Sequence, residues 1–485
     1  MGVCAHQNLK GVSAPMNTPV YPYMPNSAPK AKQAMLDALQ VPSAEALYKS
    51  VIPDDLLYKE ELSLPEPIPS EYALSRHVQG ILDRNISCEE YSSFLGAGCF
   101  RHFVPAVCEE IAGRSEFLTA YCGDTYSDHG KMQAIFEYQS LMAELLDLDV
   151  VSYTTYDGGQ AVCSALRMAL RIGKDAGRTE LLVPDTMNPE ILSQARGYCQ
   201  GAGTLRLIPH DPQTGRMDLE ALKAALSDQT AAVFLENPSY LGFFEENARS
   251  IGELAHAHGA VFIVSPEVDS LGVVESPANY GADIVCGDIQ PLGIGLQFGG
   301  SCAGFLAVRE DPRYIQELPT YLYGLAETQN EGEFGWGRAL NQRCSHGSRE
   351  HAKEYFGTAS GLWAIVAGSY LGLMGPQGMQ ELGERILQRT EYAVKALSAV
   401  PGLKVDPFGG ARFQEFIINF DACGLRIEAV NQALLQYRIF GGKDLSKDFP
   451  QLGQSALVCI SEITSADEID ALADALRQII KEAGK

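Results

Sequence analysis

Short apolar segments alternate with helical segments through the middle of the chain, and this alternation constrains the fold more than any other feature. Runs of a few apolar residues between helices are typical of parallel strands in a sheet that is covered on both faces. The predicted strands are residues 181–183, 204–208, 231–235 and 260–264, and the predicted helices are residues 189–199, 218–226 and 249–258. The sequence therefore predicts an α/β fold with a large parallel sheet.

The same pattern predicts where a ligand cleft would lie. Clefts of open parallel sheets lie beyond the carboxyl ends of the strands. Residues 237–238, 265–269 and 287–290 follow three predicted strands and are therefore expected along one edge. Residues 327–348 are polar and rich in glycine, and we expect them to form a loop over this cleft.

Length and charge narrow the class of protein. A chain of 485 residues exceeds a single average domain and is expected to form one large α/β domain and a smaller one. Its 61 acidic residues against 37 basic residues give a formal net charge of −24. This balance argues against nucleic acid as a partner, because binding to phosphates requires clustered cations.

Cysteines and the N-terminus predict the compartment. The 12 cysteines include no CxxC pair and no His/Cys cluster at zinc spacing, so we expect reduced thiols and no metal site. Residues 1–20 lack the pattern of a signal peptide, and no apolar run reaches the roughly 20 residues that would span a membrane. We therefore expect a cytoplasmic protein that does not enter a membrane.

Changes of pattern along the chain predict four parts. Residues 1–22 are expected to be a flexible N-terminal extension, and residues 23–92 a helical segment with a proline-rich linker at Pro65, Pro67 and Pro69. A large α/β domain is expected at residues 93–373 and a C-terminal α+β domain at residues 374–485.

The stretch at residues 284–300 begins in a short apolar strand, residues 283–286, and continues as a glycine-rich loop that ends at Gly299-Gly300. A second apolar strand, residues 304–308, follows at once. In chains that hold pyridoxal phosphate (PLP), the lysine that forms the Schiff base lies in a loop of this kind. This chain has Lys223 and then no lysine until Lys353. The loop is thus of a cofactor type but lacks the nucleophile.

Other elements of a PLP site are present only in part. Asp157-Gly158-Gly159-Gln160 precedes a predicted helix at residues 161–172, and free N–H groups at a helix start suit a phosphate. An acid is expected at the end of strand 260–264 to hold the pyridine nitrogen protonated, but Ser265 stands there, with Glu267 and Asp269 beyond it. The position of the lysine falls near residues 288–290 and carries no cation.

Further motifs leave alternatives open or exclude them. The turn Gly96-Ala97-Gly98 is either a packing turn or a site loop. His102, beside Arg101, either meets a carboxylate or is structural. The sequence has no GxSxG elbow, and residues 287–300 do not match a GxGxxG dinucleotide motif followed by a helix.

Taken together, many short segments resemble one family. They include residues 23–26, 93–98, 105–107, 114–121, 133–139, 156–158, 280–285, 291–294, 298–300, 375–378 and 441–445. The chain resembles the glycine cleavage system P-protein in its split form, and within it subunit 1, the α subunit of glycine dehydrogenase (decarboxylating). The resemblance runs from about Tyr23 to the C-terminus.

The resemblance implies a type I PLP-dependent transferase fold of the aspartate aminotransferase kind, with a large parallel-sheet domain and a small C-terminal α+β lobe. It also implies that this chain binds no cofactor and has no catalytic residue of its own, the lysine position falling near Gln290. A homologous β subunit would bind PLP in an α2β2 assembly, and the aminomethyl group of glycine would pass to lipoyl H-protein. Residues expected to form an active-site wall or interface are Gly96, Gly98, His102, Tyr121, Tyr156, Asp157, Gly158, Gln290, Phe298, Gly299 and Gly300.

Two segments depart from the family pattern. The loop after Thr119-Ala120 reads Tyr121-Cys122-Gly123-Asp124-Thr125, and residues 349–359 differ from the family's Arg-Glu-Lys-Ala-Thr-Ser-Asn stretch. The alternative hypothesis is therefore a diverged pseudoenzyme or regulatory subunit of a related PLP decarboxylase that acts on another amino acid.

Overall fold

The computed structural model describes residues 20–21, 23–58, 60, 62–118, 129–299, 302–345, 347–356 and 359–484. The chain divides into two compact units, Met1–Asn85 and Ile86–Lys485. The predicted extension at residues 1–22 lies outside the described residues, except for Val20 and Tyr21. The four-part division of the sequence stays a prediction.

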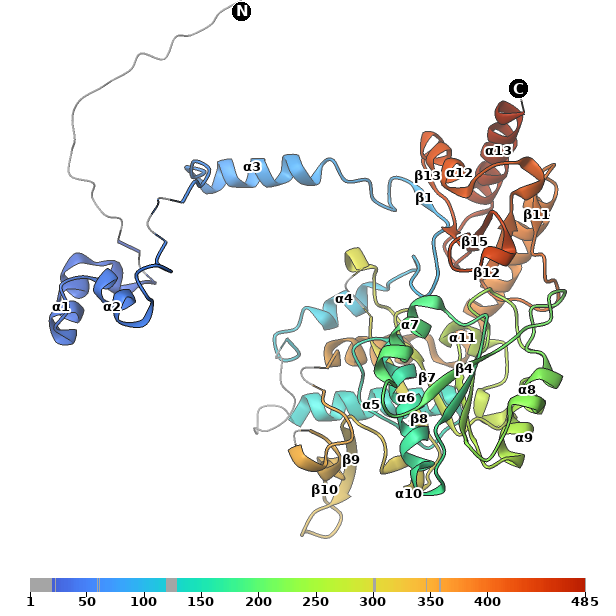
Figure 1. The fold of residues 1–485 in the computed structure, drawn as a ribbon, viewed down its shortest axis with the longest axis horizontal. Helices are drawn as coiled ribbons and strands as arrows, with labels where there is room; N and C mark the ends of the chain where they lie inside the picture. The colour runs from blue at the N-terminus through green and yellow to red at the C-terminus, as the bar shows by residue number, and fades with distance from the viewer. Residues whose placement is uncertain are drawn as a thin grey trace, which may run out of the picture. The chain divides into compact units, whose positions relative to one another are not determined.

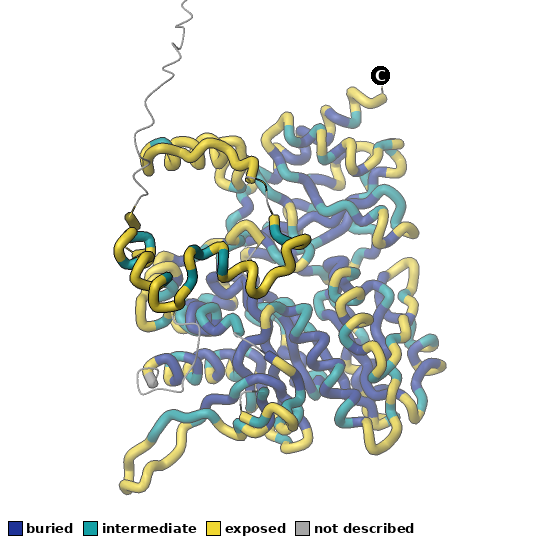
Figure 2. The backbone as a smooth tube through the Cα atoms, turned by 60° about the vertical axis from the view of Figure 1, so that its left-hand side comes forward, coloured by how far each residue is buried: buried dark blue, intermediate teal, exposed yellow. Residues whose placement is uncertain are grey.

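The described residues of the N-terminal unit form three α-helices: α1 (Pro29–Leu39), α2 (Ala44–Val51) and α3 (Glu71–Leu82). The Ser43 and Ser70 side chains cap α2 and α3 by accepting hydrogen bonds from N–H groups of the first turn. No residue of these three helices is buried, as the yellow tube of Figure 2 shows. Tertiary packing within this unit therefore contributes little to its stability.

A seven-stranded sheet forms the centre of the second unit (Figure 1). Its strands, in spatial order, are β2 (Val150–Val151), β8 (Gly304–Val308), β7 (Ile284–Asp288), β6 (Val261–Ser265), β5 (Thr230–Glu236), β3 (Glu180–Pro184) and β4 (Thr204–Ile208). Only β8 runs against its neighbours, and the other pairings are parallel. The predicted parallel sheet is confirmed.

Helices cover both faces of this sheet, so its strands are buried on both sides. Along β5, Val233 and Leu235 face one apolar cluster and Phe234 faces the other. The first cluster is covered by α5 (His129–Leu146), α8 (Leu219–Ala225), α9 (Ala248–Ala257) and α11 (Gly361–Ser398). The second is covered by α6 (Gly158–Ile172), α7 (Pro189–Tyr198) and α10 (Pro312–Ile315). Figure 2 shows the interior of this unit as buried.

A smaller α+β lobe follows, as the sequence predicted. Its sheet has the order β11 (Lys404–Val405), β12 (Glu415–Asn419), β15 (Ser455–Cys459) and β14 (Lys443–Asp444), and it packs against α12 (Ile427–Leu434) and α13 (Ala466–Ala483). β1 (Ser92–Ser93) pairs with β13 (Ile439–Phe440) of this lobe. The segment that follows β1 therefore leads from the small lobe toward the large sheet.

The glycine-rich region after the large sheet does not cover the cleft. Residues 327–348 were expected to form a loop over the cleft, but β9 (Leu322–Glu327) and β10 (Phe334–Ala339) form an antiparallel hairpin. The Trp336 ring lies 4.8 Å from the Phe136 ring of α5. This aromatic contact holds the hairpin on α5, and the prediction of a loop over the cleft is therefore wrong.

Two further features complete the unit. α4 (Ala106–Ala112) packs on α11, and α11 is interrupted at Gly375, where φ is 60° and Pro376 follows. A proline without an N–H group, next to a glycine with positive φ, interrupts a helix. Among the described residues, no helix is long and apolar enough to cross a membrane.

Candidate functional site

A cavity of about 560 Å³ opens at the carboxyl edge of the large sheet, where the strand pattern predicted a cleft. The ends of β5, β6 and β7 supply Glu236, Ser265 and Asp288. The start of α6, residues 97–100 and residues 413–415 of the small lobe complete its walls. The cavity is thus built by both domains of the second unit.

Asp288 closes the helix start that was expected to suit a phosphate. Its carboxylate accepts a hydrogen bond of 2.7 Å from the Gly158 N–H group and one of 2.8 Å from the Gln290 N–H group. Asp157 accepts a bond of 2.7 Å from the Gln160 N–H group and so caps α6. Two N–H groups of the first turn of α6, those of Gly158 and Gln160, are therefore bonded to carboxylates of the chain itself.

The approach of β7 to α6 requires glycine at position 158. A Cβ atom added to Gly158 would lie 2.8 Å from both the Cβ and the backbone N of Asp288. Burial raises the pKa of Asp288 to about 6, against the hydrogen bonds that lower it. The Asp288 carboxylate and the α6 N-terminus thus form one compact unit in the cavity wall.

Gln290 lies where a cofactor-type loop would carry its lysine, and it is fully buried. Its amide nitrogen donates to the Phe100 and Ile294 carbonyl groups at 3.1 and 2.9 Å. His102 Nε2 lies 2.7 Å from the same Ile294 oxygen, so His102 contacts a backbone carbonyl group. Neither Gln290 nor His102 lines the cavity, and together they join two loops behind its wall.

Carboxylates dominate the electrostatics of the cavity. Burial raises the pKa of Glu236 to about 7 and that of Glu415 to about 7, although backbone N–H groups bond to both. The pKa of Glu267 is also raised, by burial and then by the charges of Glu415 and Asp288. Among the described residues, no Lys, Arg or His side chain lines the cavity. Any of these carboxyl groups that is ionised would repel an anionic ligand, and no described lining side chain is a cation that could offset it.

The glycine turn serves as both a packing turn and a cavity wall. Gly98, with φ of 103°, lines the cavity together with its neighbours Ala97 and Cys99. Gly96 has no room for a side chain, because an added Cβ would lie 2.2 Å from Glu415 Oε1. The Ala97 N–H group also donates to Glu415 Oε1 at 2.5 Å. The turn therefore attaches the large domain to the small lobe.

Other predicted wall residues lie elsewhere. Tyr156 is half-exposed, with its ring 5.6 Å from the Phe356 ring. Phe298 is fully exposed, and an atom added to Gly299 would meet nothing within 4 Å. None of these three lines the cavity, although Tyr156 directly precedes Asp157 in the chain. Tyr121 and Gly300 lie outside the described residues.

Several cavity residues were missed from the sequence. Glu236 stands at the end of a predicted strand, directly before Asn237, and its position was a usable signal. Gln414 and Glu415 come from the small lobe, and no sequence spacing relates them to the large sheet. Cys99 and Cys302 lie 203 positions apart in number and meet only through the fold.

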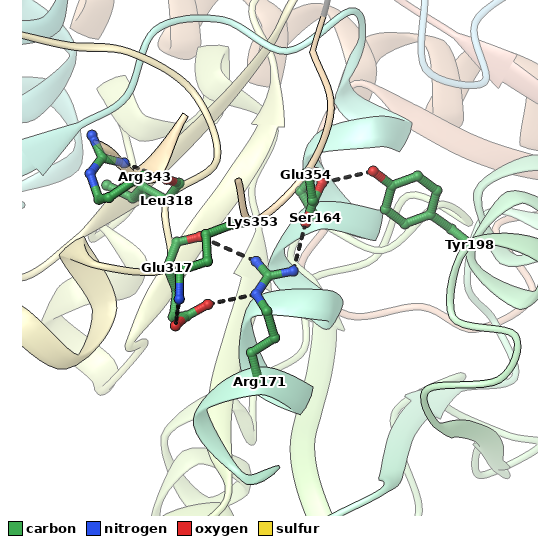
Figure 3. Close-up of polar contacts among 8 residues, drawn as sticks. All are labelled: Ser164, Arg171, Tyr198, Glu317, Leu318, Arg343, Lys353 and Glu354. Carbon is green, nitrogen blue, oxygen red and sulfur yellow. Dashed lines mark hydrogen bonds and ion pairs between the residues drawn. The ribbon is translucent and has the colours of Figure 1, made fainter. Parts of the chain in front are cut away.

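A buried ion-pair network fixes the segment that departs from the family pattern (Figure 3). Glu354 accepts hydrogen bonds from Ser164 at 2.6 Å and Tyr198 at 2.7 Å, and pairs with Arg171 at 3.1 Å. Glu317 bridges Arg171 and Lys353. Ser164 and Arg171 belong to α6, so this network holds residues 353–354 against the helix whose first turn borders the cavity.

Comparison with known proteins shows the family of this chain. The sequence profile of the family described as "Glycine cleavage system P-protein" matches residues 22–476. The chain belongs to this family. "Probable glycine dehydrogenase (decarboxylating) subunit 1" of Staphylothermus marinus is 36% identical over 469 residues, which span 95% of this chain and 99% of that protein.

Solved structures support the family and the fold. A glycine decarboxylase (P-protein) of the glycine cleavage system, solved in inhibitor-bound form, has a TM-score of 0.81 and 30% identity over 93% of this chain and 98% of that chain. Burkholderia pseudomallei sphingosine-1-phosphate lyase has a TM-score of 0.63 at 15% identity, over 90% of this chain and 95% of that chain. The P-protein homologue described here has the predicted type I PLP-dependent transferase fold.

The residues around the cavity do not fit PLP itself. No lysine is available at the β7 loop, because Gln290 is buried in its place. Asp288 already takes the Gly158 N–H group that a phosphate would need, and Ser265 ends β6 where an acid would serve the pyridine nitrogen. Among the described residues, no lining cation would offset the charge of a phosphate dianion.

Proposed function

We propose that this chain is the α subunit of a glycine-decarboxylating P-protein, an oxidoreductase component that is active only with a β partner. Relatives named glycine dehydrogenase (decarboxylating) subunit 1 match it over 99% of their own length. A name shared along whole chains favours this function over a diverged subunit for another amino acid. The word "subunit" in that name also supports the existence of a partner chain.

The observation that carries the assignment of roles is the contact between Asp288 and Gly158. The carboxylate occupies the helix start at 2.7 Å, in a cavity without lining cations. We propose that this chain binds no PLP and that the β subunit supplies the cofactor, which takes up electrons as the carboxylate of glycine leaves. In the proposed α2β2 assembly, the aminomethyl group then passes to lipoyl H-protein.

The role proposed for this chain is to complete and support the partner's active site. Its described surface includes exposed residues of the glycine-rich loop, such as Phe298. We propose that this loop faces the partner. We propose the same for Tyr156, which lies just before the start of α6. Free thiols at the ten described cysteines support a cytoplasmic location for the complex.

Absorbance of the purified chain tests the cofactor assignment. After incubation with excess PLP and gel filtration, we expect no absorbance band of a protein-bound aldimine and no label after borohydride reduction. The lysine-bearing homologous subunit is the matched control and should show both. A reducible band on this chain alone would contradict the assignment.

Exchange of glycine with bicarbonate tests the function. We expect exchange only when this chain, a lysine-bearing β subunit and lipoyl H-protein are mixed, and none with either subunit alone. A stable complex of the two subunits that exchanges no glycine would contradict the proposed substrate. Replacement of glycine by other small amino acids in the same assay then measures specificity.

A further inference from the structure

A second cavity lies near the C-terminal end of α6, and we call it the basic pocket. It has a volume of about 340 Å³ and shares no lining residue with the first cavity. Its walls come from the C-terminal half of α6, the turn between α6 and β3, and the loop between α7 and β4. Its described lining residues include four basic side chains and no acidic one: Arg167, Arg171, Lys174 and Arg178. The basic pocket is therefore a local concentration of positive charge in a chain whose formal net charge is −24.

Three of these four cations have no counter-charge in the chain. Arg171 pairs with two carboxylates of the network in Figure 3, so its charge is offset. Among the described residues, no carboxylate pairs with Arg167, Lys174 or Arg178. Like charges that line one pocket repel each other. An anion that binds between them would remove this repulsion.

The Arg178 side chain is held in place without a carboxylate. Its Nη1 atom donates a hydrogen bond of 2.6 Å to the Thr230 carbonyl group. The side chain also packs over the end of α6, because a Cβ atom added to Gly173 would lie 2.8 Å from the Arg178 Cβ atom. A guanidinium group that is positioned before a ligand arrives loses little side-chain entropy on binding.

We propose that the basic pocket binds a small compound with two linked phosphate groups. The three unpaired cations match the several negative charges of such a compound at neutral pH. The guanidinium groups of Arg167 and Arg178 can each donate to two oxygens of one phosphate group, and Lys174 adds a point charge. The volume lies in the range of roughly 300–1,000 Å³ that is usual for ligand pockets.

Titration calorimetry of the full chain with inorganic pyrophosphate tests the proposal. We expect one site per chain, with a Kd that rises as salt is added, because salt screens exposed charges. Arg167→Gln and Lys174→Gln should each raise the Kd about threefold to tenfold, and the double variant should raise it further. Citrate at the same ionic strength should bind more weakly than pyrophosphate, because its planar carboxylates present fewer oxygens to the three cations.

Matched controls separate the pocket from a general attraction to positive charge. Arg385→Gln and Lys395→Gln remove the same charges from exposed positions of α11 and should leave the Kd unchanged. A footprint on the wild-type chain needs no variant that has to fold. Pyrophosphate should slow the acetylation of Lys174 and leave that of Lys395 unchanged.

Three results would overturn the proposal. They are a Kd that neither pocket variant changes more than the α11 controls do, citrate binding as tight as that of pyrophosphate, and equal acetylation of Lys174 with and without pyrophosphate. None of these measurements uses a β subunit, PLP or glycine. Their outcome is therefore independent of the function proposed above.

Discussion

At the scale of single residues, the contact between Gly158 and Asp288 defines one wall of the cavity and leaves no space for a side chain at position 158. Gly158 touches Asp288 so closely that its missing side chain is a structural requirement. The result is a helix start that is held by an internal carboxylate and not by a ligand. The chemistry of the site therefore follows from packing as much as from charge.

Replacing Gly158 by alanine tests this contact. We expect Gly158→Ala to lower the free energy of unfolding by about 1–3 kcal/mol, because the new methyl group overlaps Asp288. Gly197→Ala is the control, since Gly197 lies within α7 with nothing near a new Cβ. That variant should be unchanged or more stable by up to about 1 kcal/mol. Equal effects in denaturant titrations would contradict the close approach.

The raised pKa of Glu236 predicts a dependence of stability on pH. The folded chain keeps a proton on Glu236 up to a pKa of about 7, whereas the unfolded chain loses it near the ordinary value of 4.5. The folded state therefore binds more protons between these values, and its stability falls as pH rises through this window. Glu236→Gln should reduce that fall by about 1–3 kcal/mol, measured from pH 5 to pH 8.

The control for this measurement is Glu253→Gln on the exposed face of α9. It should leave the slope of stability against pH unchanged. If Glu236→Gln also leaves the slope unchanged, Glu236 ionises in the folded chain as it does in the unfolded one.

Residues of the site differ in how far the sequence reveals them. Asp157 and Gly158 were predicted because a turn before a helix is a local pattern, and both line the cavity. Glu415 was not, because its place depends on the docking of the small lobe. Gln290 was predicted to stand near the position of a lysine, but its burial behind the wall depends on contacts with Phe100, which is far away in sequence.

At the scale of elements, α6 connects the cavity to the ion-pair network of Figure 3. Its first turn meets Asp288, and its later residues Ser164 and Arg171 meet Glu354. The segment that differs from the family pattern is therefore anchored to the same helix that borders the cavity. A change in this segment can reach the cavity through α6.

Removal of Glu354 tests this anchoring. We expect Glu354→Ala to cost about 2–4 kcal/mol of stability, because Arg171 loses a buried partner and two hydroxyl groups lose their acceptor. Glu350→Ala, an exposed position in the same segment, should change stability by less than about 0.5 kcal/mol. Similar losses for both variants in thermal unfolding would contradict the network.

Elements were predicted from the sequence to different extents. The alternating strands of the large sheet were found because buried parallel strands read as apolar runs. The hairpin of β9 and β10 was missed, because its six-residue strands contain three glycines, which are depleted in strands. Its position is set by the Trp336 contact with Phe136, which no local pattern encodes.

At the scale of the whole molecule, the two units differ in how they are stabilised. The second unit has large apolar clusters, whereas helices α1 to α3 bury no residue. Limited proteolysis should therefore cut within residues 52–70, where no described residue is helical. We expect a stable fragment that begins within residues 53–71 and keeps the unfolding temperature of the full chain within a few degrees.

The contact between Asp288 and Gly158 also bears on how such a chain can change over generations. A Gln290→Lys substitution alone would break the bonds that join two loops and would leave the helix start occupied. For this chain to bind PLP, a lysine would have to appear, the start of α6 would have to become free, and acidic neighbours would have to be lost. Each of these changes alone would not create a binding site. If a partner chain carries the cofactor, as proposed, the Asp288–Gly158 contact makes it difficult for this chain to regain cofactor binding. The two chains then stay dependent on each other.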